Sequence, residues 1–327
     1  MENFYNNKVV LVTGGAGSIG SELVRKLIKL NSQVVRILDN NETALFELEQ
    51  ELSSNKVRTL VGDIRDRKRL QRAFEGVDIV FHAAALKHVP LCEFNPSDAV
   101  KTNVLGTQNV IDAALDEELE KVVLVSTDKA VNPTNVMGAT KLLAERLIVS
   151  ANNYKGKRKT IFSCVRFGNV LASRGSVLPI FKKQIESGGP VTITDPKMTR
   201  FIMSISDAVE LILKGATISN GGDIFILKMP ALRIVDLAEV MIKELSTKYG
   251  YDAKEINLKI AGKRPGEKMY EELMTEDEAK CAVEMDGLYI LNHGQSEGSS
   301  IFGCNSNNAK MLLKEEIKEI MKAINVI

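Results

Sequence analysis

An acidic and a basic side chain stand next to each other in the middle of the chain, at Asp128 and Lys129. They follow the apolar run Val122–Val125, which is typical of a buried strand, and Thr127 directly precedes them. Side chains at the carboxyl end of a strand in an open α/β sheet lie where such sheets bind ligands. The pair could therefore provide a general acid and a general base in one site. The alternative is a salt bridge within a loop, which is the more common role of an isolated Asp-Lys pair.

A glycine-rich segment near the start of the chain is the second chemical feature. Glycines recur with the spacing Gly14-x-x-Gly17-x-x-Gly20 directly after the apolar run Val9–Val12. Glycine lets the backbone approach a pyrophosphate, whose charge is favoured at the start of a helix. Here that start falls at Ser18 and Ile19. The context predicts a dinucleotide site rather than a structural turn, and beside such a site the functional interpretation of Asp128-Lys129 is favoured.

Acidic and small residues after the next strands indicate which dinucleotide binds. Asp39 ends the second predicted strand, where an acid receives the ribose hydroxyls. Its carboxylate would repel a 2′-phosphate, so NAD is favoured over NADP. Asp63, in the segment Gly62–Ile64, is expected to reach the adenine amino group, with a solvated turn as the alternative. Ala83 and Ala84 are small enough for the cofactor to lie close to the backbone. The predicted cofactor contacts are Gly14, Gly17, Ser18, Ile19, Gly20, Asp39, Asp63, Ile64, Ala83 and Ala84.

The elements that must position these residues alternate along the first half of the chain. β-branched apolar runs predict strands, and amphipathic stretches between them predict helices. The predicted strands are Lys8–Val12, Val34–Leu38, Arg58–Leu60, Ile79–Phe81, Lys121–Val125, Thr160–Val165 and Ile224–Leu227. The predicted helices are Gly20–Leu30, Glu42–Leu52, Asp66–Phe74, Ala99–Leu115, Gly138–Ser150, Ile234–Lys248 and Asn308–Ala323. This order predicts an α/β protein with a doubly wound parallel sheet of the Rossmann type.

The pattern becomes less regular after residue 167, and a length of 327 residues suggests about two domains. We expect an NAD-binding Rossmann domain over residues 1–167, to which 201–228 return. A smaller, interleaved C-terminal α/β domain is expected over 168–200 and 229–327.

The composition excludes several classes of partner. With 43 Lys and Arg against 42 Asp and Glu, the net charge is +1, and aromatic residues make up 5%. These values argue against nucleic acid as a partner. The four cysteines lack metal-ligand spacing, so no metal site is expected. We find no signal peptide and no long apolar stretch, which predicts a cytoplasmic protein without a membrane partner.

The glycine spacing, Asp63, His82–Ala85, Asn103 and Lys141 together resemble the extended short-chain dehydrogenase/reductase superfamily. The resemblance implies a Rossmann domain and a small C-terminal domain that binds a nucleotide sugar. Members of that superfamily use a tyrosine one helical turn before the lysine, so that both side chains share a helix face. Met137 occupies the tyrosine position here. Because a thioether is no base, an alcohol oxidoreductase that works through tyrosine is disfavoured.

Longer motifs narrow the resemblance. The run from Ser126 to Lys141 is similar to the UDP-N-acetylglucosamine 4,6-dehydratases of polysaccharide biosynthesis, some of which have Met at the tyrosine position. Many such relatives carry an N-terminal membrane domain, which we do not expect here. The resemblance covers nearly the whole chain, and the other matching segments are Leu86–Pro90, Arg166–Val170, Ser173–Val177, Met198–Phe201 and Arg264–Lys268.

The resemblance implies an internal redox elimination. C4 of the sugar is oxidised by a tightly bound NAD, water leaves across C5–C6, and the hydride returns to C6, so that the cofactor is recycled. We expect Lys129 to be the base at C5, with a pKa lowered by Lys141 or by burial. Asp128 is expected to be the acid at the C6 hydroxyl, kept protonated by burial. Thr127 would hydrogen-bond the C4 oxygen, and Lys141 would hold the nicotinamide ribose.

The nucleotide half of the substrate requires further residues from the matching segments. Arg200 and Arg264 are expected at the diphosphate, because guanidinium groups match phosphate oxygens. Glu267 is expected at the uridine ribose, and Asn169 at the diphosphate or the sugar. Taken singly, each of these has a surface salt bridge as its alternative role.

Three residues in loops complete the predicted substrate contacts. Val177 belongs to the segment Ser173–Val177, which is expected to cover the uracil. Lys87 and His88 lie in the segment Leu86–Pro90, and His88 would approach the N-acetyl group or the hexose. An ordinary loop histidine is the alternative.

Three other functions stay open at this point. The first is a 5-inverting dehydratase, although the resemblance of the run Ala130–Met137 to the family implies retention of configuration at C5. The second is a dehydratase or C4 epimerase for another nucleotide sugar, against which Met137 and Asp128-Lys129 count in the case of an epimerase. The third is an inactive NAD-binding module. The resemblance also implies a homo-oligomer.

Overall fold

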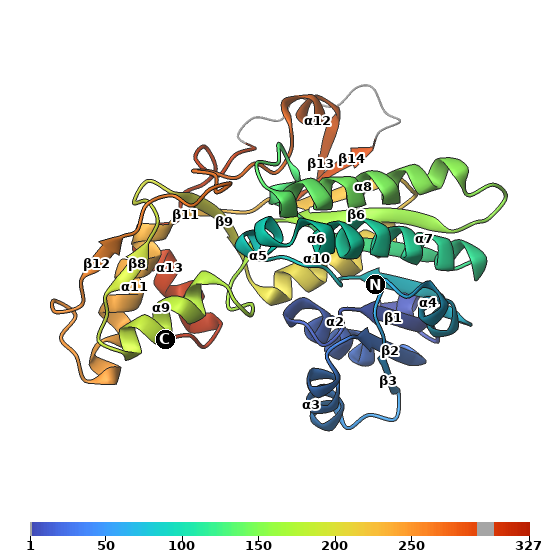
Figure 1. Cartoon of the computed structure of the whole chain (residues 1–327), viewed down its shortest axis with the longest axis horizontal. Helices are drawn as coiled ribbons and strands as arrows, with labels where there is room; N and C mark the ends of the chain where they lie inside the picture. Colours follow the sequence, from blue (N-terminus) through green and yellow to red (C-terminus); the bar gives the residue numbers. More distant parts are fainter. Residues whose placement is uncertain (1, 293–303) are drawn as a thin grey trace.

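One large sheet forms the centre of the molecule (Figure 1). The computed structural model describes residues 2–292 and 304–327, and in them nine strands pair in the order β13-β14-β10-β6-β5-β4-β1-β2-β3. The strands from β3 to β10 in this order run parallel, and β14 and β13 extend the β10 edge in antiparallel fashion. Their bounds are β1 Val9–Thr13, β2 Val34–Asp39, β3 Val57–Val61, β4 Ile79–His82, β5 Lys121–Thr127, β6 Ile161–Phe167, β10 Asp223–Leu227, β13 Ala282–Met285 and β14 Leu288–Asn292. The predicted doubly wound Rossmann sheet is confirmed.

Helices cover both faces of this sheet, which explains why its central strands are apolar throughout. Helices α2 (Ser18–Lys29) and α10 (Ile205–Ile218) pack side by side, and so do α4 (Arg67–Phe74), α7 (Gly106–Asp116) and α8 (Val136–Tyr154) on the other side. Helix α3 (Glu42–Leu52) packs on β2 and β3. Strand order reverses between β1 and β4, so the carboxyl ends of these strands form the crevice where ligands bind in such sheets.

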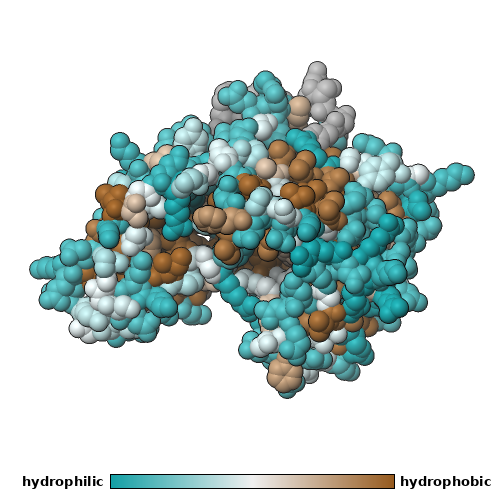
Figure 2. Space-filling model, viewed as in Figure 1, coloured by the Kyte–Doolittle hydropathy of each residue, from teal (hydrophilic) through white to brown (hydrophobic). Residues whose placement is uncertain are grey.

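A smaller part of the chain contains a second hydrophobic core. It is built around α9 (Val177–Glu186), α11 (Ile234–Leu245) and α13 (Lys314–Ala323). Its strands are β7 (Asn169–Val170), β9 (Thr199–Met203) and β11 (Ala231–Arg233) in one sheet, and β8 (Val191–Ile193) with β12 (Leu258–Ile260) in another. On the face shown in Figure 2, the surface is hollowed between this part and the part that carries α2 and α3.

Three predicted features differ from the structure. The predicted helix Ala99–Leu115 is divided into a π-helical turn, Val100–Leu105, and α7. The predicted helix Asn308–Ala323 begins only at Lys314, because Met311 pairs with Ala231 and the Leu312 N–H donates to the Ala231 carbonyl at 2.8 Å. The sequence-based division placed all of 229–327 in the smaller domain, whereas β13 and β14 extend the large sheet.

The remaining elements are short. They are α1 (Glu2–Tyr5), α5 (Val89–Phe94), α6 (Pro96–Ala99), the 3-10 turns Asp128–Ala130 and Thr247–Tyr249, and α12 (Glu276–Cys281). Among the described helices, none is long and apolar enough to cross a membrane.

Candidate active site

The glycine-rich turn between β1 and α2 lies at the crevice and is shaped by close backbone contacts. Gly14 has φ of 65°, and a Cβ atom added there would lie 2.7 Å from the Ala84 backbone. A Cβ atom on Gly20 would lie 2.3 Å from the Gly14 carbonyl oxygen. The Ala83 N–H donates to the Thr13 carbonyl at 3.1 Å, which joins β4 to this turn. The turn and the alanines thus form a cradle without side chains, as a pyrophosphate requires.

Asp39, at the end of β2, holds this cradle in place by hydrogen bonds to backbone N–H groups. Its carboxylate accepts hydrogen bonds from the Ala16 N–H and the Asn41 N–H, both at 3.0 Å. Arg36 points away, since its guanidinium donates to the carbonyls of Ala73 and Glu75 at 2.8 and 2.7 Å. The end of β2 therefore presents a carboxylate, with this arginine committed elsewhere.

The segment after β3 contains Asp63, the predicted adenine contact, in an ion pair with its own neighbour. Arg65 forms an ion pair with Asp63 at 2.6 Å, and this partner keeps the pKa of the Asp63 carboxyl below its usual range despite partial burial. The Asp63 carboxylate is therefore engaged within its own turn. Ile64 is buried and lies against Gly106 at the start of α7.

His82, at the end of β4, connects the elements that surround the crevice by hydrogen bonds. Its ring lies 2.7 Å from Thr13 Oγ1 and 3.1 Å from Thr107 Oγ1, which connects β1, β4 and α7. Burial, with help from Lys141, lowers the pKa of His82 to about 3. A histidine that stays neutral at every physiological pH is a structural link here, not an acid–base group.

Met137 and Lys141 lie in the first two turns of helix α8, next to the crevice. The Lys141 amine donates to the Val125 carbonyl at 2.7 Å, and burial lowers its pKa to about 8 although Glu145 acts in the opposite direction. Met137 is buried against Cys92 and Ala99. The position that carries tyrosine in the superfamily is thus occupied by a buried, apolar side chain.

Thr127, Asp128 and Lys129 form one hydrogen-bonded group at the carboxyl end of β5. Thr127 Oγ1 donates to Asp128 Oδ1 at 2.9 Å, and Lys129 Nζ donates to the same oxygen at 2.8 Å. The Asp128 side chain is fully buried, and its Oδ2 has no hydrogen-bond partner among the described residues. A Cβ atom on Gly138 would lie 2.3 Å from the Lys129 carbonyl oxygen, so this turn packs directly on the start of α8.

The predicted pKa of Lys129 is wrong in direction. Burial does act to lower the pKa, but the carboxylates of Asp128 and Glu271 outweigh burial and Arg200, so that the pKa of Lys129 lies above its usual range. The sequence argument considered Lys141 and burial as the influences on this amine. It missed the second carboxylate, which comes from a distant segment.

Glu271 is the residue that sequence reasoning missed. It is 3% exposed, and its Oε1 lies 3.5 Å from Lys129 Nζ and 3.7 Å from Arg200 Nε. Burial, reinforced by Asp128, raises the pKa of Glu271 against the nearby cations. The sequence offers one weak signal, namely two adjacent glutamates shortly after the segment Arg264–Lys268.

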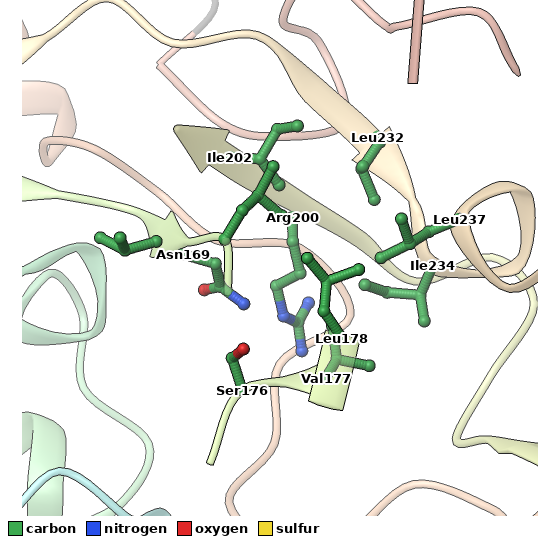
Figure 3. A pocket seen from close by; sticks show the side chains of 11 residues that line it. Asn169, Ser176, Val177, Leu178, Arg200, Ile202, Leu232, Ile234 and Leu237 are labelled. Atoms are coloured by element: carbon green, nitrogen blue, oxygen red, sulfur yellow. The ribbon is translucent and has the colours of Figure 1, made fainter. Parts of the chain in front are cut away.

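A small cavity beside this group collects three of the predicted substrate residues. Asn169, Val177 and Arg200 line it together with Ser176, and Figure 3 shows the guanidinium, amide and hydroxyl groups directed toward a shared space. Asn169 Oδ1 also accepts from Lys129 Nζ at 3.0 Å, which connects the cavity to the group of Thr127, Asp128 and Lys129. The cavity encloses about 20 Å³, room for roughly one water molecule.

Arg200 is held tightly in this structure. It is buried, and its guanidinium donates to the carbonyls of Thr199 and Lys268 at 2.7 and 2.9 Å. Glu267 Oε1 lies 3.8 Å from it. The Arg200 side chain, which is predicted to bind the diphosphate, is thus held in place by the protein's own carbonyl groups.

Arg264 and Glu267 lie in a turn that docks on the loop before α8. The Arg264 N–H donates to Glu267 Oε2 at 3.2 Å, while the Arg264 side chain is exposed. Thr134 Oγ1 and Asn135 Nδ2 both donate to the Gly266 carbonyl, at 2.9 and 3.0 Å. Glu267 is therefore brought near Arg200, and the side chain of Arg264 stays at the surface.

Lys87 and His88 contact a different segment, the loop before α9. Lys87 Nζ donates to the Arg174 carbonyl at 2.7 Å, and the Arg174 N–H donates to Ser18 Oγ at 2.9 Å. A Cβ atom on Gly175 would lie 2.5 Å from the His88 ring. This loop thus bridges the predicted substrate segment 86–90 and the glycine-rich turn.

The sheet order and the glycine cradle define a Rossmann-fold nucleotide-binding protein. The chain belongs to the polysaccharide biosynthesis protein family, whose profile matches residues 10–293. In the residues that the structure describes, no group of His, Cys, Asp and Glu side chains is suited to hold a metal ion.

Two relatives show how far the sequence similarity extends. A Methanocaldococcus jannaschii protein described as an uncharacterized membrane protein is 61% identical over 331 residues, which cover 100% of this chain and 99% of that protein. The UDP-N-acetylglucosamine 4,6-dehydratase (inverting) of Campylobacter jejuni is 41% identical over 290 residues, which cover 88% of this chain and 84% of that protein.

Solved structures give the same family relationship. Pen from Bacillus thuringiensis superimposes with a TM-score of 0.94 at 43% identity and covers 98% of both chains. The dTDP-glucose 4,6-dehydratase DesIV of Streptomyces venezuelae, crystallised with NAD and TYD, has a TM-score of 0.71 at 25% identity and covers 80% of this chain and 86% of its own. The chain is thus related to nucleotide-sugar 4,6-dehydratases and epimerases.

Proposed function

We propose that this chain is an NAD-dependent UDP-N-acetylglucosamine 4,6-dehydratase, which forms a UDP-4-keto-6-deoxy-N-acetylhexosamine with retention at C5. The observation that carries the proposal is the bonded group of Thr127, Asp128 and Lys129 at the carboxyl end of β5. An acid and a base stand there beside the dinucleotide crevice, while Met137 fills the tyrosine position. The 41% identity to a protein named as this dehydratase supports the substrate class.

The residues of the crevice fit a nicotinamide dinucleotide. The side-chain-free cradle at Gly14 and Gly20 suits a pyrophosphate at the N-terminus of α2. Asp39 suits ribose hydroxyls, and because Arg36 is bonded elsewhere, no contact seen at this strand end favours a 2′-phosphate. When bound, the cofactor would accept a hydride from C4 and return one to C6. Lys141 would donate to the nicotinamide ribose in its charged form.

The chain's own residues would move the protons. Lys129 in its neutral form would take the proton from C5, which is acidic once C4 is a ketone. Asp128 in its protonated form would give a proton to the departing C6 hydroxyl, so that water leaves. As C4 is oxidised, the proton of its hydroxyl would pass to Thr127 Oγ1 while Thr127 gives its own proton to the Asp128 carboxylate, and this forms the protonated Asp128 that the elimination uses. On return of the hydride to C6, the Lys129 ammonium would give its proton back to C5.

The substrate's nucleotide half would lie along the cavity of Asn169, Val177 and Arg200. Arg200 supplies a fixed guanidinium for the diphosphate, and Glu267 lies close enough to share the ribose side of the same region.

Incubation of the protein with UDP-N-acetylglucosamine and NAD tests the proposal. We expect mass spectrometry to show a product that lacks one water, and NMR to show unchanged configuration at C5. An unchanged substrate, with turnover of a GDP- or dTDP-sugar, would move the assignment to a sister activity. No turnover of any nucleotide sugar, with NAD still bound, would favour an inactive binding module.

A 5-inverting dehydratase is the second candidate. The printed name of the Campylobacter jejuni relative, which specifies inversion, favours it. The same NMR measurement separates the two, because an inverted C5 proton changes its couplings to its neighbours on the ring.

A further inference from the structure

Glu271 is the one carboxylate in the site that comes from outside the segments already assigned a role. It follows the turn Arg264–Lys268 and is placed by backbone hydrogen bonds: its N–H donates to Ser306 Oγ at 2.9 Å, and its carbonyl accepts from the Ser306 N–H at 2.8 Å. Ser306 is fully buried and its hydroxyl also bonds Thr199 at 2.8 Å. These contacts fix Glu271 between strand β9 and the catalytic group.

The Glu271 carboxylate lacks bonds of its own that would explain its burial. Its Oε2 has no hydrogen-bond partner among the described residues, and Oε1 approaches Lys129 and Arg200 only at 3.5 and 3.7 Å. Burial of a carboxylate is costly unless it is bonded. A structural glutamate would be expected to satisfy both oxygens, as Glu145 does with the two Arg166 bonds at 3.1 and 2.7 Å.

The charges that face this pair come from several elements. Lys129 faces Asp128 from its own turn, Glu271 from the 264–272 segment and Arg200 from β9. Glu271 faces Lys129, Asp128 and Arg200, and also Lys268. The Lys129 ammonium thus lies between two carboxylates of the protein, Asp128 and Glu271, and these stabilise its charged form.

We propose that Glu271 is a positioning residue for Lys129: its negative charge holds the third proton on the lysine amine, and loss of that charge frees the amine to act as a base. The use of the neutral amine rests on the proposed function. The electrostatic link between Glu271 and Lys129 does not, because it follows from the distances alone.

The link also resolves a conflict in the site. A base at C5 needs a neutral amine, whereas the two carboxylates keep Lys129 charged. Since burial favours the protonated form of Glu271, this carboxyl is the one that can give up its charge inside the site. The two groups titrate as a pair, and a proton on Glu271 makes the proton on Lys129 easier to remove.

Competitive labelling of lysines tests this link without any need for turnover. The full-length protein with NAD is treated with trace acetic anhydride, and mass spectrometry gives the rate at Lys129 relative to the exposed Lys254. Only neutral amines react, so the rate reports the proton on Lys129. In Glu271→Gln we expect a rise of roughly tenfold or more, since an opposite charge at this distance shifts a pKa by about 1 to 3 units.

Two further variants complete the experiment. Glu272→Gln is the matched control, because Glu272 contacts Lys268 and Asn132 rather than Lys129, and its Lys129 rate should equal that of the wild type. Glu271→Asp keeps the charge at a greater distance and should give an intermediate rate, which also decides the matter if Glu271→Gln does not fold. Labelling of Lys129 within about twofold of the wild type in both Glu271 variants would overturn the proposal.

The pH dependence of turnover separates the two proposals. If the protein dehydrates UDP-N-acetylglucosamine, the rising limb of its kcat profile should move to lower pH in Glu271→Gln, by about 1 to 3 units. If the wild type shows no turnover, the proposed function fails, and the labelling result still decides the link between Glu271 and Lys129.

Discussion

The carboxyl ends of neighbouring strands in the large sheet form two regions of opposite composition, called here the first edge, at β1 and β4, and the second edge, at β5. At the ends of β1 and β4, glycines and alanines expose backbone, and the side chain of His82 is neutral and serves only to connect elements. At the end of β5, buried charged side chains face one another, with Asp128 and Lys129 in contact at 2.8 Å. The first edge therefore depends on the space that each residue leaves free, and the second on the charges around each residue.

The largest expected effect removes space from the first edge. Gly14→Ala would place a Cβ atom 2.7 Å from the Ala84 backbone at a φ of 65°. We expect loss of measurable NAD binding and a stability loss of about 2 to 5 kcal/mol, from strain and overpacking. Calorimetric titration with NAD and denaturant unfolding measure the two effects.

Gly76→Ala is the control for that change. Gly76 has a φ of 67°, yet an added Cβ atom would meet nothing within 4 Å. It should lose only about 1 to 2 kcal/mol and keep NAD binding. Equal NAD affinities in the two variants would show that the close approach to Ala84 has no importance for the cofactor.

A smaller effect concerns the charge buried between the two edges. Burial lowers the pKa of Lys141 to about 8 from an ordinary 10.5, so the unfolded chain binds more protons than the folded one between these values. Stability of the cofactor-free protein should therefore rise with pH in this window, relative to Lys141→Met, by about 2 to 3 kcal/mol. Urea unfolding of both proteins at pH 7 and pH 10 measures it. A difference that is constant with pH would mean that Lys141 keeps its ordinary pKa.

The smallest expected effect concerns the choice of cofactor at the first edge. Asp39→Asn removes the carboxylate but keeps an acceptor for the Ala16 N–H. The ratio of NADP affinity to NAD affinity should rise by about tenfold, roughly 1.4 kcal/mol, because repulsion of the 2′-phosphate is lost. Binding constants for both dinucleotides give the ratio, and an unchanged ratio would remove Asp39 as the reason to favour NAD.

The same contrast explains what could be predicted from sequence. Strand and helix types follow from local apolar patterns, and α3 has the predicted bounds Glu42–Leu52 because Asn41 caps it with its own side chain. The glycine spacing predicts the cradle for the same reason, since its contacts lie within one loop and its neighbouring strand. The local pattern predicts the wrong structure where a residue far away in the sequence determines the conformation. At Asn308–Leu313, pairing with Ala231 takes the place of the predicted helix.

The arrangement of Thr127, Asp128 and Lys129 follows from the sequence only in part. Thr127, Asp128 and Lys129 are adjacent in sequence, so their proximity required no fold. The charge on Lys129, by contrast, depends on Glu271, which lies more than a hundred residues away in the sequence. Two adjacent glutamates, such as Glu271 and Glu272, are also typical of an exposed surface, so the sequence does not mark Glu271 as a buried residue. The diphosphate contact of Arg264 stays a prediction, because its N–H bonds Glu267 while its side chain lies at the surface.

Exchange of the C5 proton with heavy water tests the central claim most directly. The wild type, incubated with UDP-N-acetylglucosamine and NAD in deuterated buffer, should incorporate deuterium at C5, and Lys129→Ala should lose this exchange by about 10²- to 10⁴-fold while it still binds NAD. Exchange at the wild-type rate in Lys129→Ala would contradict the assignment of Lys129 as the base.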